Sequence, residues 1–422
     1  MKLSAVEHRL CSRIAGRAGA LLDDLRLHVG LPTGGNNAAA LDESRRRLCD
    51  RLSALGATVE LVAGGSRPEW LYGAGAPGVV PPTAVCRRTA SGGPGATRVL
   101  LAGHLDTVHD PRGEFRELSV APDGKTATGP GCVDMKGGLV ILVAALEALE
   151  ECGIASAWSV LLNSDEETGS YHSEAALRAE AARHDVGLAV EPALPGGELA
   201  VERLGSGQFM LDAFGRAAHV GRDFERGISA VNALAACILG AARLSDPARG
   251  LIVSIGPVEG GHATNVVPDR ARAWGNVRFP SAAGAEELGR GIDALRAMVS
   301  AAGAPDGPGG EGALPRVEVR RSFNRPAKPM TQRVRVLAEL ARRAAEDLGQ
   351  RLPFGKTGGV CDGNILQDEG LPTIDTLGVR GGGLHTPKEW IEIPSLVERC
   401  QLLGVVLCRL AQGGIPFTDG AT

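Results

Sequence analysis

The sequence predicts an α/β fold with a mostly parallel central sheet flanked by helices, together with a smaller inserted α+β sandwich. Three observations predict it. Short apolar runs alternate with helical segments up to Val190, the residue pattern changes after Glu191, and a helical pattern returns from Thr331. Strands that alternate with helices favour a parallel sheet, because the crossover between two parallel strands needs the length of a helix. The 422 residues suffice for two or three domains.

The elements of the larger domain follow from the spacing of apolar residues. Leucine and isoleucine recur at helical spacing from Leu10 to Leu55, which predicts helices there. The segment Gly137–Glu151 is apolar on most sides, so we expect a buried helix. Short apolar runs bounded by polar residues predict strands at 58–62, 84–87, 98–102, 158–163, 186–190 and 373–379.

The segment after Pro195-Gly196-Gly197 has a different pattern of elements. Strands are predicted at 208–214, 251–255, 271–279 and 317–321, and helices at 229–244 and 286–300, with a Gly/Pro stretch at 303–312. This βαββαβ order indicates a separate domain, residues 204–321. It interrupts a larger domain of residues 1–203 and 322–422, which resumes with a helix at 331–348.

Composition and charge exclude several classes of protein. The chain has 45 basic and 49 acidic residues, a net charge of −4, so no cation excess is available for nucleic acid. The longest uncharged apolar run, Gly137–Leu146, is too short to span a membrane, and the N-terminus shows no apolar stretch typical of a secretion signal. The nine cysteines are scattered with no C-x-x-C pair. These features predict a cytoplasmic protein that binds neither nucleic acid nor membrane.

Polar side chains that could bind a metal follow the predicted strands. They are His104 and Asp106 in Gly-His-Leu-Asp-Thr-Val, Asp134 in a glycine-rich loop, Asp165-Glu166-Glu167, Glu191, and His385 after three glycines. Taken singly, each has an ordinary alternative, such as a structural histidine, a helix N-cap or a solvated acidic loop. Open α/β sheets, however, bind ligands at the carboxyl ends of their strands, so we expect these residues to meet.

Two histidines and several carboxylates form a mixed nitrogen and oxygen donor set. Such a set suits zinc, cobalt or manganese and disfavours magnesium and copper(I). It also leaves one glutamate free to act as a general base. This is the composition that a two-metal hydrolase needs.

The order and spacing of these motifs resemble the zinc-dependent exopeptidase family that includes glutamate carboxypeptidase, acetylornithine and succinyl-diaminopimelate deacylases, and aminoacylase. The resemblance covers nearly the whole chain. It implies a catalytic α/β domain with two divalent metal ions per subunit, Zn²⁺ in the first place and Co²⁺ or Mn²⁺ as alternatives. It also implies that the inserted domain is a lid that forms a homodimer.

The resemblance assigns a role to each motif of the larger domain. His104 and Glu191 would hold one metal ion, Glu167 and His385 the other, and Asp134 would bridge the two. Glu166 resembles the catalytic base that deprotonates water. Asp106 resembles the acid that orients His104.

Four further residues match positions that contact substrate in the family. His219 in Gly-Arg-Ala-Ala-His-Val-Gly resembles the histidine that reaches the partner subunit's active site and polarises the scissile carbonyl. Asn265 and Arg278 match substrate contacts in the lid, and Arg325 in Asn-Arg-Pro matches the arginine that clamps the substrate's carboxylate. The chain departs from the family pattern at Pro130 and Cys361, which leaves the metal ligands untouched but affects specificity.

The resemblance predicts a metal-dependent hydrolase that cleaves an amide bond next to a free carboxylate, most like glutamate carboxypeptidase. A glutamate at Glu191 resembles the carboxypeptidase and deacylase branches, and the guanidinium groups of Arg278 and Arg325 favour a small anionic N-acyl amino acid or peptide. The alternatives are an N-acyl-amino-acid deacylase and a hydrolase of an unusual amide or arylamine. A non-catalytic metal-binding homologue is a further alternative; it would have lost the base or a ligand, and none is missing here.

Overall fold

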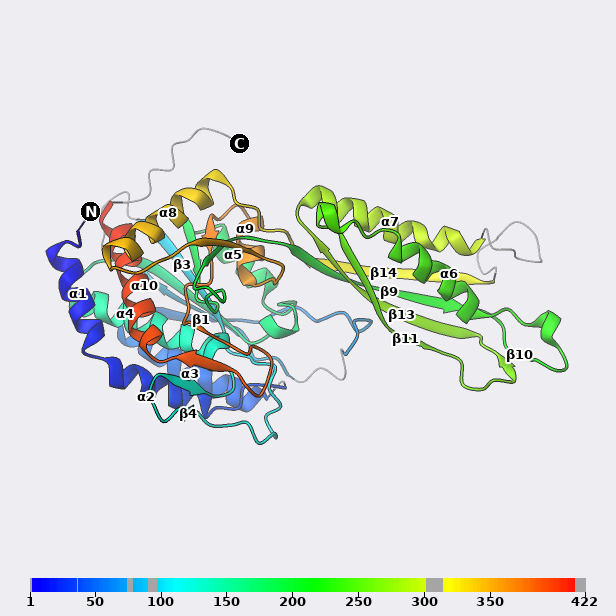
Figure 1. The fold of residues 1–422 in the computed structure, drawn as a ribbon, viewed down its shortest axis with the longest axis horizontal. Helices are drawn as coiled ribbons and strands as arrows, with labels where there is room; N and C mark the ends of the chain where they lie inside the picture. The colour runs from blue at the N-terminus through cyan, green and yellow to red at the C-terminus, as the bar shows by residue number, and fades with distance from the viewer. Residues whose placement is uncertain (1, 36, 74–78, 90–96, 301–313, 414–422) are drawn as a thin grey trace.

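The computed structural model describes residues 2–35, 37–73, 79–89, 97–300 and 314–413. Figure 1 shows two lobes side by side along the long axis of the molecule. One is built on a six-stranded sheet and the other on a four-stranded sheet. The predicted Gly/Pro stretch at 303–312 lies outside the described residues. Within them, no helix combines the length and apolar character needed to cross a bilayer.

The six-stranded sheet has the order β1-β2-β6-β3-β7-β16. The pairs β3–β6, β3–β7 and β7–β16 are parallel, whereas β1–β2 and β2–β6 are antiparallel. The mostly parallel sheet is therefore confirmed. Its strands are β1 (Thr58–Val62), β2 (Thr83–Arg88), β3 (Arg98–His104), β6 (Ala157–Asn163), β7 (Val186–Ala189) and β16 (Thr373–Ile374).

Helices cover both faces of this sheet. Alternate strand residues such as Leu101 and Leu100 belong to two different apolar clusters, one on each face, because successive side chains of a strand point in opposite directions. The first face packs against α1 (Ala5–Ala15), α2 (Ala18–Val29), α3 (Ala38–Ala54), α4 (Gly137–Glu151), α8 (Gln332–Asp347) and α10 (Pro394–Gly413). The second packs against α5 (Glu174–Ala181) and α9 (Asp362–Asp368). As its composition predicts, α4 is buried on nearly every side.

The second lobe is a four-stranded antiparallel sheet of order β11-β13-β9-β14. Its strands are β9 (Gly205–Phe214), β11 (Ile252–Gly260), β13 (Arg270–Phe279) and β14 (Arg316–Arg325). Helices α6 (Ala230–Ala242) and α7 (Ala282–Ser300) lie on one face and close an apolar core of their own (Figure 1). The chain order β9-α6-β11-β13-α7-β14 is the βαββαβ arrangement, and β14 extends past the predicted domain boundary at residue 321.

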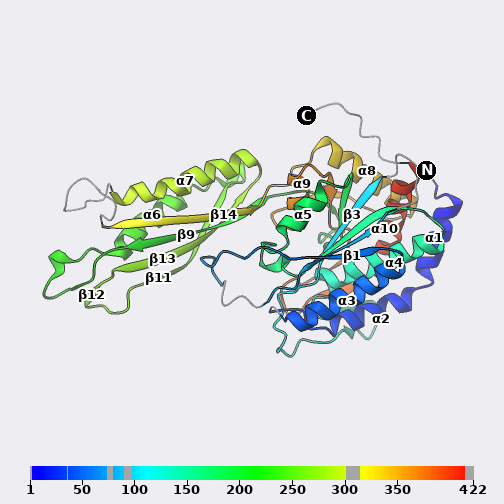
Figure 2. The ribbon, with the colours of Figure 1, turned by 180° about the vertical axis from the view of Figure 1, so that it is seen from behind.

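Short strand pairs complete the structure. β17 (Gly381–Gly382), β18 (Trp390–Glu392), β5 (Thr126–Thr128) and β4 (Ser119–Val120) form one small sheet. β8 (Leu199–Arg203) pairs with β15 (Phe354–Thr357), and β10 (Ala218–His219) pairs with β12 (Val266–Val267). In Figures 1 and 2, β10 and β12 lie at the end of the second lobe farthest from the six-stranded sheet.

Candidate metal centre

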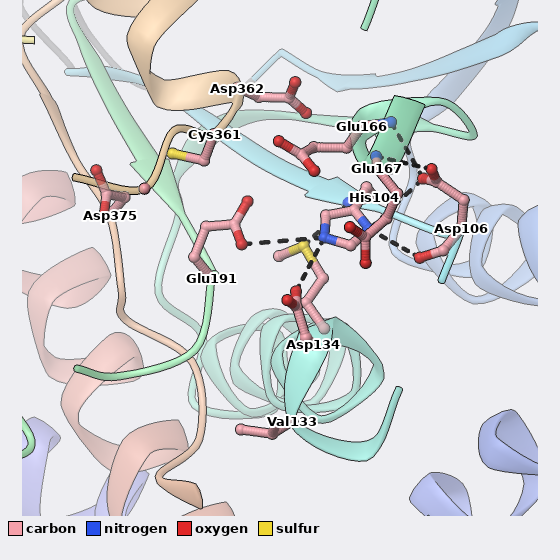
Figure 3. Close-up of polar contacts among 12 residues, drawn as sticks. His104, Asp106, Val133, Asp134, Glu166, Glu167, Glu191, Cys361, Asp362 and Asp375 are labelled. Atoms are coloured by element: carbon pink, nitrogen blue, oxygen red, sulfur yellow. Dashed lines mark hydrogen bonds and ion pairs between the residues drawn. The ribbon is translucent and has the colours of Figure 1, made fainter. Parts of the chain in front are cut away.

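The carboxyl ends of three adjacent parallel strands bring the predicted polar residues together. His104 is the last residue of β3, Glu191 follows β7, and the three-residue 3₁₀ turn Glu166–Thr168 follows β6. Because β3 lies between β6 and β7, these side chains converge on one point (Figure 3). Asp134 reaches the same point from the turn before α4.

Two groups of possible metal ligands share Asp134. The first is His104, Asp134 and Glu191, and the second is Asp134, Glu167 and His385, with the ligand atoms of each group within 4.8 Å of one another. His104 Nε2 lies 3.2 Å from Asp134 Oδ1, and His385 Nε2 lies 3.5 Å from Asp134 Oδ2. The two oxygens of one carboxylate thus face two different imidazoles, which is the arrangement expected of a bridging ligand.

The electrostatics of these groups suit a pair of cations. Burial raises the pKa of Glu191 to about 8 and also raises the pKa of Glu167, because a desolvated carboxylate resists ionisation. Hydrogen bonds to Asp134 and Glu167 raise the pKa of His385 to about 10. Cations at the shared oxygens would neutralise the carboxylates in place of these protons. The donor set therefore fits divalent cations that accept both nitrogen and oxygen ligands.

Asp106 holds two parts of this site in place through hydrogen bonds. Its backbone oxygen accepts a hydrogen bond from His104 Nδ1 at 2.9 Å, which leaves Nε2 of that ring free to face the cluster. Its carboxylate accepts the backbone N–H groups of Glu166 at 3.2 Å and Glu167 at 2.9 Å. Asp106 therefore fixes both the imidazole of His104, in the first ligand group, and the turn that carries Glu167, in the second.

The adjacent residues Glu166 and Glu167 point in different directions. Glu167 Oε2 lies 3.3 Å from His385 Nε2, whereas Glu166 Oε1 accepts a hydrogen bond from Arg325 Nη2 at 2.8 Å. Burial raises the pKa of Glu166 well above its ordinary value. Glu166 thus lies beside the ligand groups as a carboxyl that is 11% exposed and belongs to neither of them.

Arg325 is engaged by protein carboxylates in this structure. It is only 3% exposed, and besides Glu166 it donates to Asp362 Oδ1 at 3.1 Å. Among the described residues, Nε of Arg325 has no hydrogen-bond partner, so it is a donor that remains for a substrate carboxylate, the role that its motif implies.

A cavity of about 920 Å³ opens over the ligand groups. Its walls come from both lobes: the metal-ligand candidates lie on one side, and residues of β9 and β13, including Gln208, Asn276 and Arg278, lie on the other. Arg278 is therefore placed at the same cavity as Glu166.

His219 and Asn265 lie elsewhere. The backbone N–H of Val220, next to His219, donates to the backbone oxygen of Asn265 at 3.0 Å, so the two predicted lid residues are neighbours. Both are exposed. His219 is in β10 and Asn265 directly precedes β12, and these two strands lie at the end of the second lobe farthest from the six-stranded sheet (Figures 1 and 2). Within one chain, the structure does not bring them to the cavity.

Glu389 is a buried residue of the site that sequence reasoning missed. Its carboxylate accepts the backbone N–H groups of Gly131, Val133 and Asp134 at 2.9, 2.9 and 3.0 Å, and His109 Nε2 lies 2.6 Å from it. The turn that presents Asp134 is therefore held by an acid some 255 residues away along the chain. Its only sequence signal is its position four residues after His385, which gives no hint of its partners.

We expect Glu389→Gln to weaken metal binding by about 10- to 100-fold, because the amide would place a donor against backbone donors and loosen the turn that carries Asp134. Competition with a chromophoric chelator measures this affinity. Glu339→Gln, on the surface of α8, is the matched control and should leave affinity unchanged. Equal affinities in both variants would show that Glu389 does not position the bridging residue.

Comparisons of the sequence with known proteins give a family match and several relatives. A family model described as Peptidase family M20/M25/M40 matches residues 100–409. Carboxypeptidase G2 of Pseudomonas sp. (strain RS-16) is 27% identical over 326 residues, covering 76% of this chain and 76% of the relative. Succinyl-diaminopimelate desuccinylase of Methylorubrum populi is 29% identical over 335 residues, covering 74% and 82%.

Solved structures share the fold over nearly the whole chain. A tripeptidase from Staphylococcus aureus superposes with a TM-score of 0.74 at 21% identity, covering 93% of this chain and 98% of that one. A Bacillus subtilis protein described as a dinuclear metal binding peptidase superposes with a TM-score of 0.64 at 14% identity, covering 94% and 99%. The predicted fold class is thereby confirmed.

Proposed function

The chain belongs to peptidase family M20/M25/M40, and from this membership we propose that it cleaves an amide bond next to a free carboxylate, in the manner of a glutamate carboxypeptidase. As a member, it is a metal-dependent hydrolase of amide bonds. One observation carries the proposed hydrolysis: two imidazole–carboxylate groups share Asp134, and the carboxyl of Glu166, which accepts a hydrogen bond from Arg325, lies beside them.

We propose that each subunit binds two divalent cations, with zinc as the first choice and cobalt or manganese as alternatives. His104 and Glu191 would hold one, Glu167 and His385 the other, and Asp134 would join them. When bound, such a pair polarises a carbonyl oxygen and acidifies water. The name of the Bacillus subtilis structure, a dinuclear metal binding peptidase, supports the number of ions.

The protein's own residues supply the proton transfers. Glu166 takes a proton from the attacking water and later delivers it to the leaving nitrogen. Its raised pKa suits the first step, because a carboxylate with a raised pKa is a stronger base. Arg325 holds its carboxylate in place, and Asp106 fixes the backbone N–H of the same residue.

The substrate is a small anionic N-acyl amino acid or peptide. The guanidinium of Arg278 at the cavity supports this choice, because it can bind a carboxylate through two hydrogen bonds. The relatives include both a carboxypeptidase and a desuccinylase, so an N-acyl-amino-acid deacylase is the second candidate. A hydrolase of an unusual amide or arylamine is the third.

The test is a panel of N-acyl amino acids and dipeptides, each with a free carboxylate or the corresponding primary amide, assayed with zinc, cobalt and manganese. We expect hydrolysis of the free acids and a large loss with the amides. Equal rates on acids and amides would contradict the requirement for a carboxylate. No hydrolysis across the panel would contradict the proposed function.

Metal stoichiometry gives a separate prediction. Titration of metal-free protein with zinc should reach about two equivalents per chain. Glu167→Ala and Glu191→Ala each remove one non-shared ligand from a different group, so each should leave about one tight equivalent. Calorimetry or elemental analysis measures the ratio. A single tight equivalent in the wild-type protein would contradict the shared role of Asp134.

We also propose that residues 204–321 form a lid that dimerises. Large apolar side chains on α6 and β11 are exposed, including Val231, Leu239, Ile252 and Val258, and a second copy of the chain could cover them.

We propose that the protein is located in the reducing cytoplasm. The nine cysteines are all free thiols, which supports this location.

A further inference from the structure

Of the residues that the structure describes, five arginines line the cavity, and three of them are neutralised by protein carboxylates. Arg203 Nη2 lies 2.7 Å from Asp375 Oδ1, and Arg325 binds Glu166 and Asp362. Arg380 lies 2.7 Å from Glu392 and 2.6 Å from Glu398. The positive charges of these three residues are therefore committed to holding the protein together.

Arg67 and Arg278 differ from the other three. Neither forms an ion pair anywhere in the part of the chain that the structure describes. Among the described residues, the buried atoms Nη1 of Arg278 and Nε of Arg67 have no hydrogen-bond partner, and Arg67 Nη2 makes a long hydrogen bond, 3.4 Å, to the backbone oxygen of Tyr72. A partly desolvated guanidinium with unused donors is costly unless an anion satisfies it.

The segment that carries Arg67 is fixed at the cavity by contacts to both lobes. On one side, the backbone N–H of Gly64 donates to His172 Nε2 at 3.2 Å, and a side chain at Gly64 would collide with the His172 carbonyl oxygen at 1.9 Å. On the other side, Trp274 Nε1 in β13 donates to the backbone oxygen of Trp70 at 2.7 Å. This segment, between β1 and β2, extends towards the second lobe in Figures 1 and 2.

The rings of Tyr72 and Trp274 add a second contact on the same side, with centroids 5.3 Å apart. Tyr171, whose hydroxyl donates to Ser322 Oγ in β14 at 3.1 Å, also lines the cavity. Arg67 therefore lies in a part of the cavity wall that contacts between the first lobe and β13 hold in place.

We propose that Arg67 and Arg278 form a binding subsite for a second carboxylate of the substrate, so that the preferred substrates are dicarboxylic: an acidic side chain or a dicarboxylic acyl group in addition to the carboxylate next to the scissile amide. The inference rests on the proposed function. The acidic metal-ligand groups and the two unpaired guanidinium groups line one cavity, and an extended anionic substrate can contact both. Arg67, which lies outside the motifs of the catalytic site, becomes a specificity-determining residue.

Two matched substrate pairs test the subsite and locate the second carboxylate. In the first pair, N-acetyl-glutamate and N-acetyl-glutamine, the second carboxylate is present or absent on the amino acid. In the second pair, N-succinyl-leucine and its succinamide analogue, it is present or absent on the acyl group. We expect the wild-type zinc enzyme to prefer the acidic member of at least one pair by about 10- to 100-fold in kcat/KM. Arg67→Met should abolish that preference by raising KM for the acidic member, with little change for the neutral one. Arg67→Lys should retain part of it.

Arg343→Met is the matched control, because it removes the same charge from an exposed position of α8 outside the cavity. Its preference should equal that of the wild type. If Arg67→Met lowers kcat/KM equally for acidic and neutral substrates, Arg67 supports the fold and the subsite is refuted.

Binding without turnover separates this proposal from the proposed function. Calorimetry measures the affinities for glutarate and for its monoamide. Arg67→Met should weaken the affinity for glutarate at least about tenfold more than the affinity for the monoamide. A wild-type enzyme that hydrolyses nothing yet binds glutarate through Arg67 would refute the proposed function and support the subsite. An active enzyme in which Arg67→Met leaves glutarate affinity unchanged would refute the subsite alone.

Discussion

Glu166→Gln is expected to lower kcat by about 10²- to 10⁴-fold while both metal ions stay bound. The amide oxygen can still accept the hydrogen bond from Arg325 Nη2, so the local packing is preserved. What the variant loses is the ability to take a proton from water, because an amide is not a base at neutral pH. Steady-state kinetics together with metal analysis of the same preparation measure both quantities.

Glu167→Gln is the control for that experiment, since the two residues are adjacent and carry the same group. It should weaken one metal ion, because Glu167 Oε2 lies 3.3 Å from His385 Nε2 within one of the ligand groups. Its activity should recover in part when excess metal is supplied, whereas that of Glu166→Gln should not. If Glu166→Gln retained full activity, the base would have to be another residue.

His219→Ala is expected to lower kcat by about 100- to 1000-fold, although His219 does not line the cavity of its own chain and its strand, β10, lies at the end of the second lobe farthest from the six-stranded sheet (Figure 1). The expectation follows from the proposed dimer, in which the imidazole of one lid donates to the carbonyl oxygen of the substrate bound to the partner. One donor of this kind contributes roughly 2.7–4 kcal/mol as negative charge develops on that oxygen. Metal content should not change.

Dimers that contain one chain of each variant show whether His219 acts in the active site of its own chain or in that of the partner. Glu166→Gln and His219→Ala chains are each nearly inactive, but a dimer of one of each would contain one site with both an intact base and an intact histidine. Activity should therefore return in part after the two proteins are mixed and subunit exchange is verified by mass. Should exchange occur without any return of activity, His219 would not act across the dimer.

Much of the larger lobe could be predicted from local patterns. The predicted limits of α4, Gly137–Glu151, agree with the structure, because the apolar residues of a helix mark its buried sides. The predicted limits of β1, Thr58–Val62, agree as well, although this strand is mostly exposed. The strand predicted at 373–379 is wrong in length, since β16 ends at Ile374. Thr376 has a positive φ, and its hydroxyl accepts the backbone N–H of Ala200, so a contact with a distant segment ends the strand.

In the second lobe, too, the order of elements could be predicted from the sequence, but the end of one strand could not. Its βαββαβ order could be predicted from apolar spacing, but β14 continues to Arg325, past the predicted boundary at 321. Its last residues turn towards the cavity, where Arg325 pairs with Glu166 and Asp362. Burial beside the other lobe determines where this strand ends, and a local pattern carries no record of that burial.

By itself, the sequence determined which residues could bind metal: His104, Asp134, Glu167, Glu191 and His385 are polar side chains beside buried strands, turns and glycines, and this contrast is local. Only the tertiary structure decided how they are held and what opposes them. Glu389 supports Asp134 across some 255 residues, Arg325 is engaged by Glu166, and Arg67 faces the same cavity without a carboxylate partner in the described chain. The physical reason is that burial patterns repeat within a few residues, whereas hydrogen bonds and unpaired charges at a site depend on segments that meet only when the chain has folded.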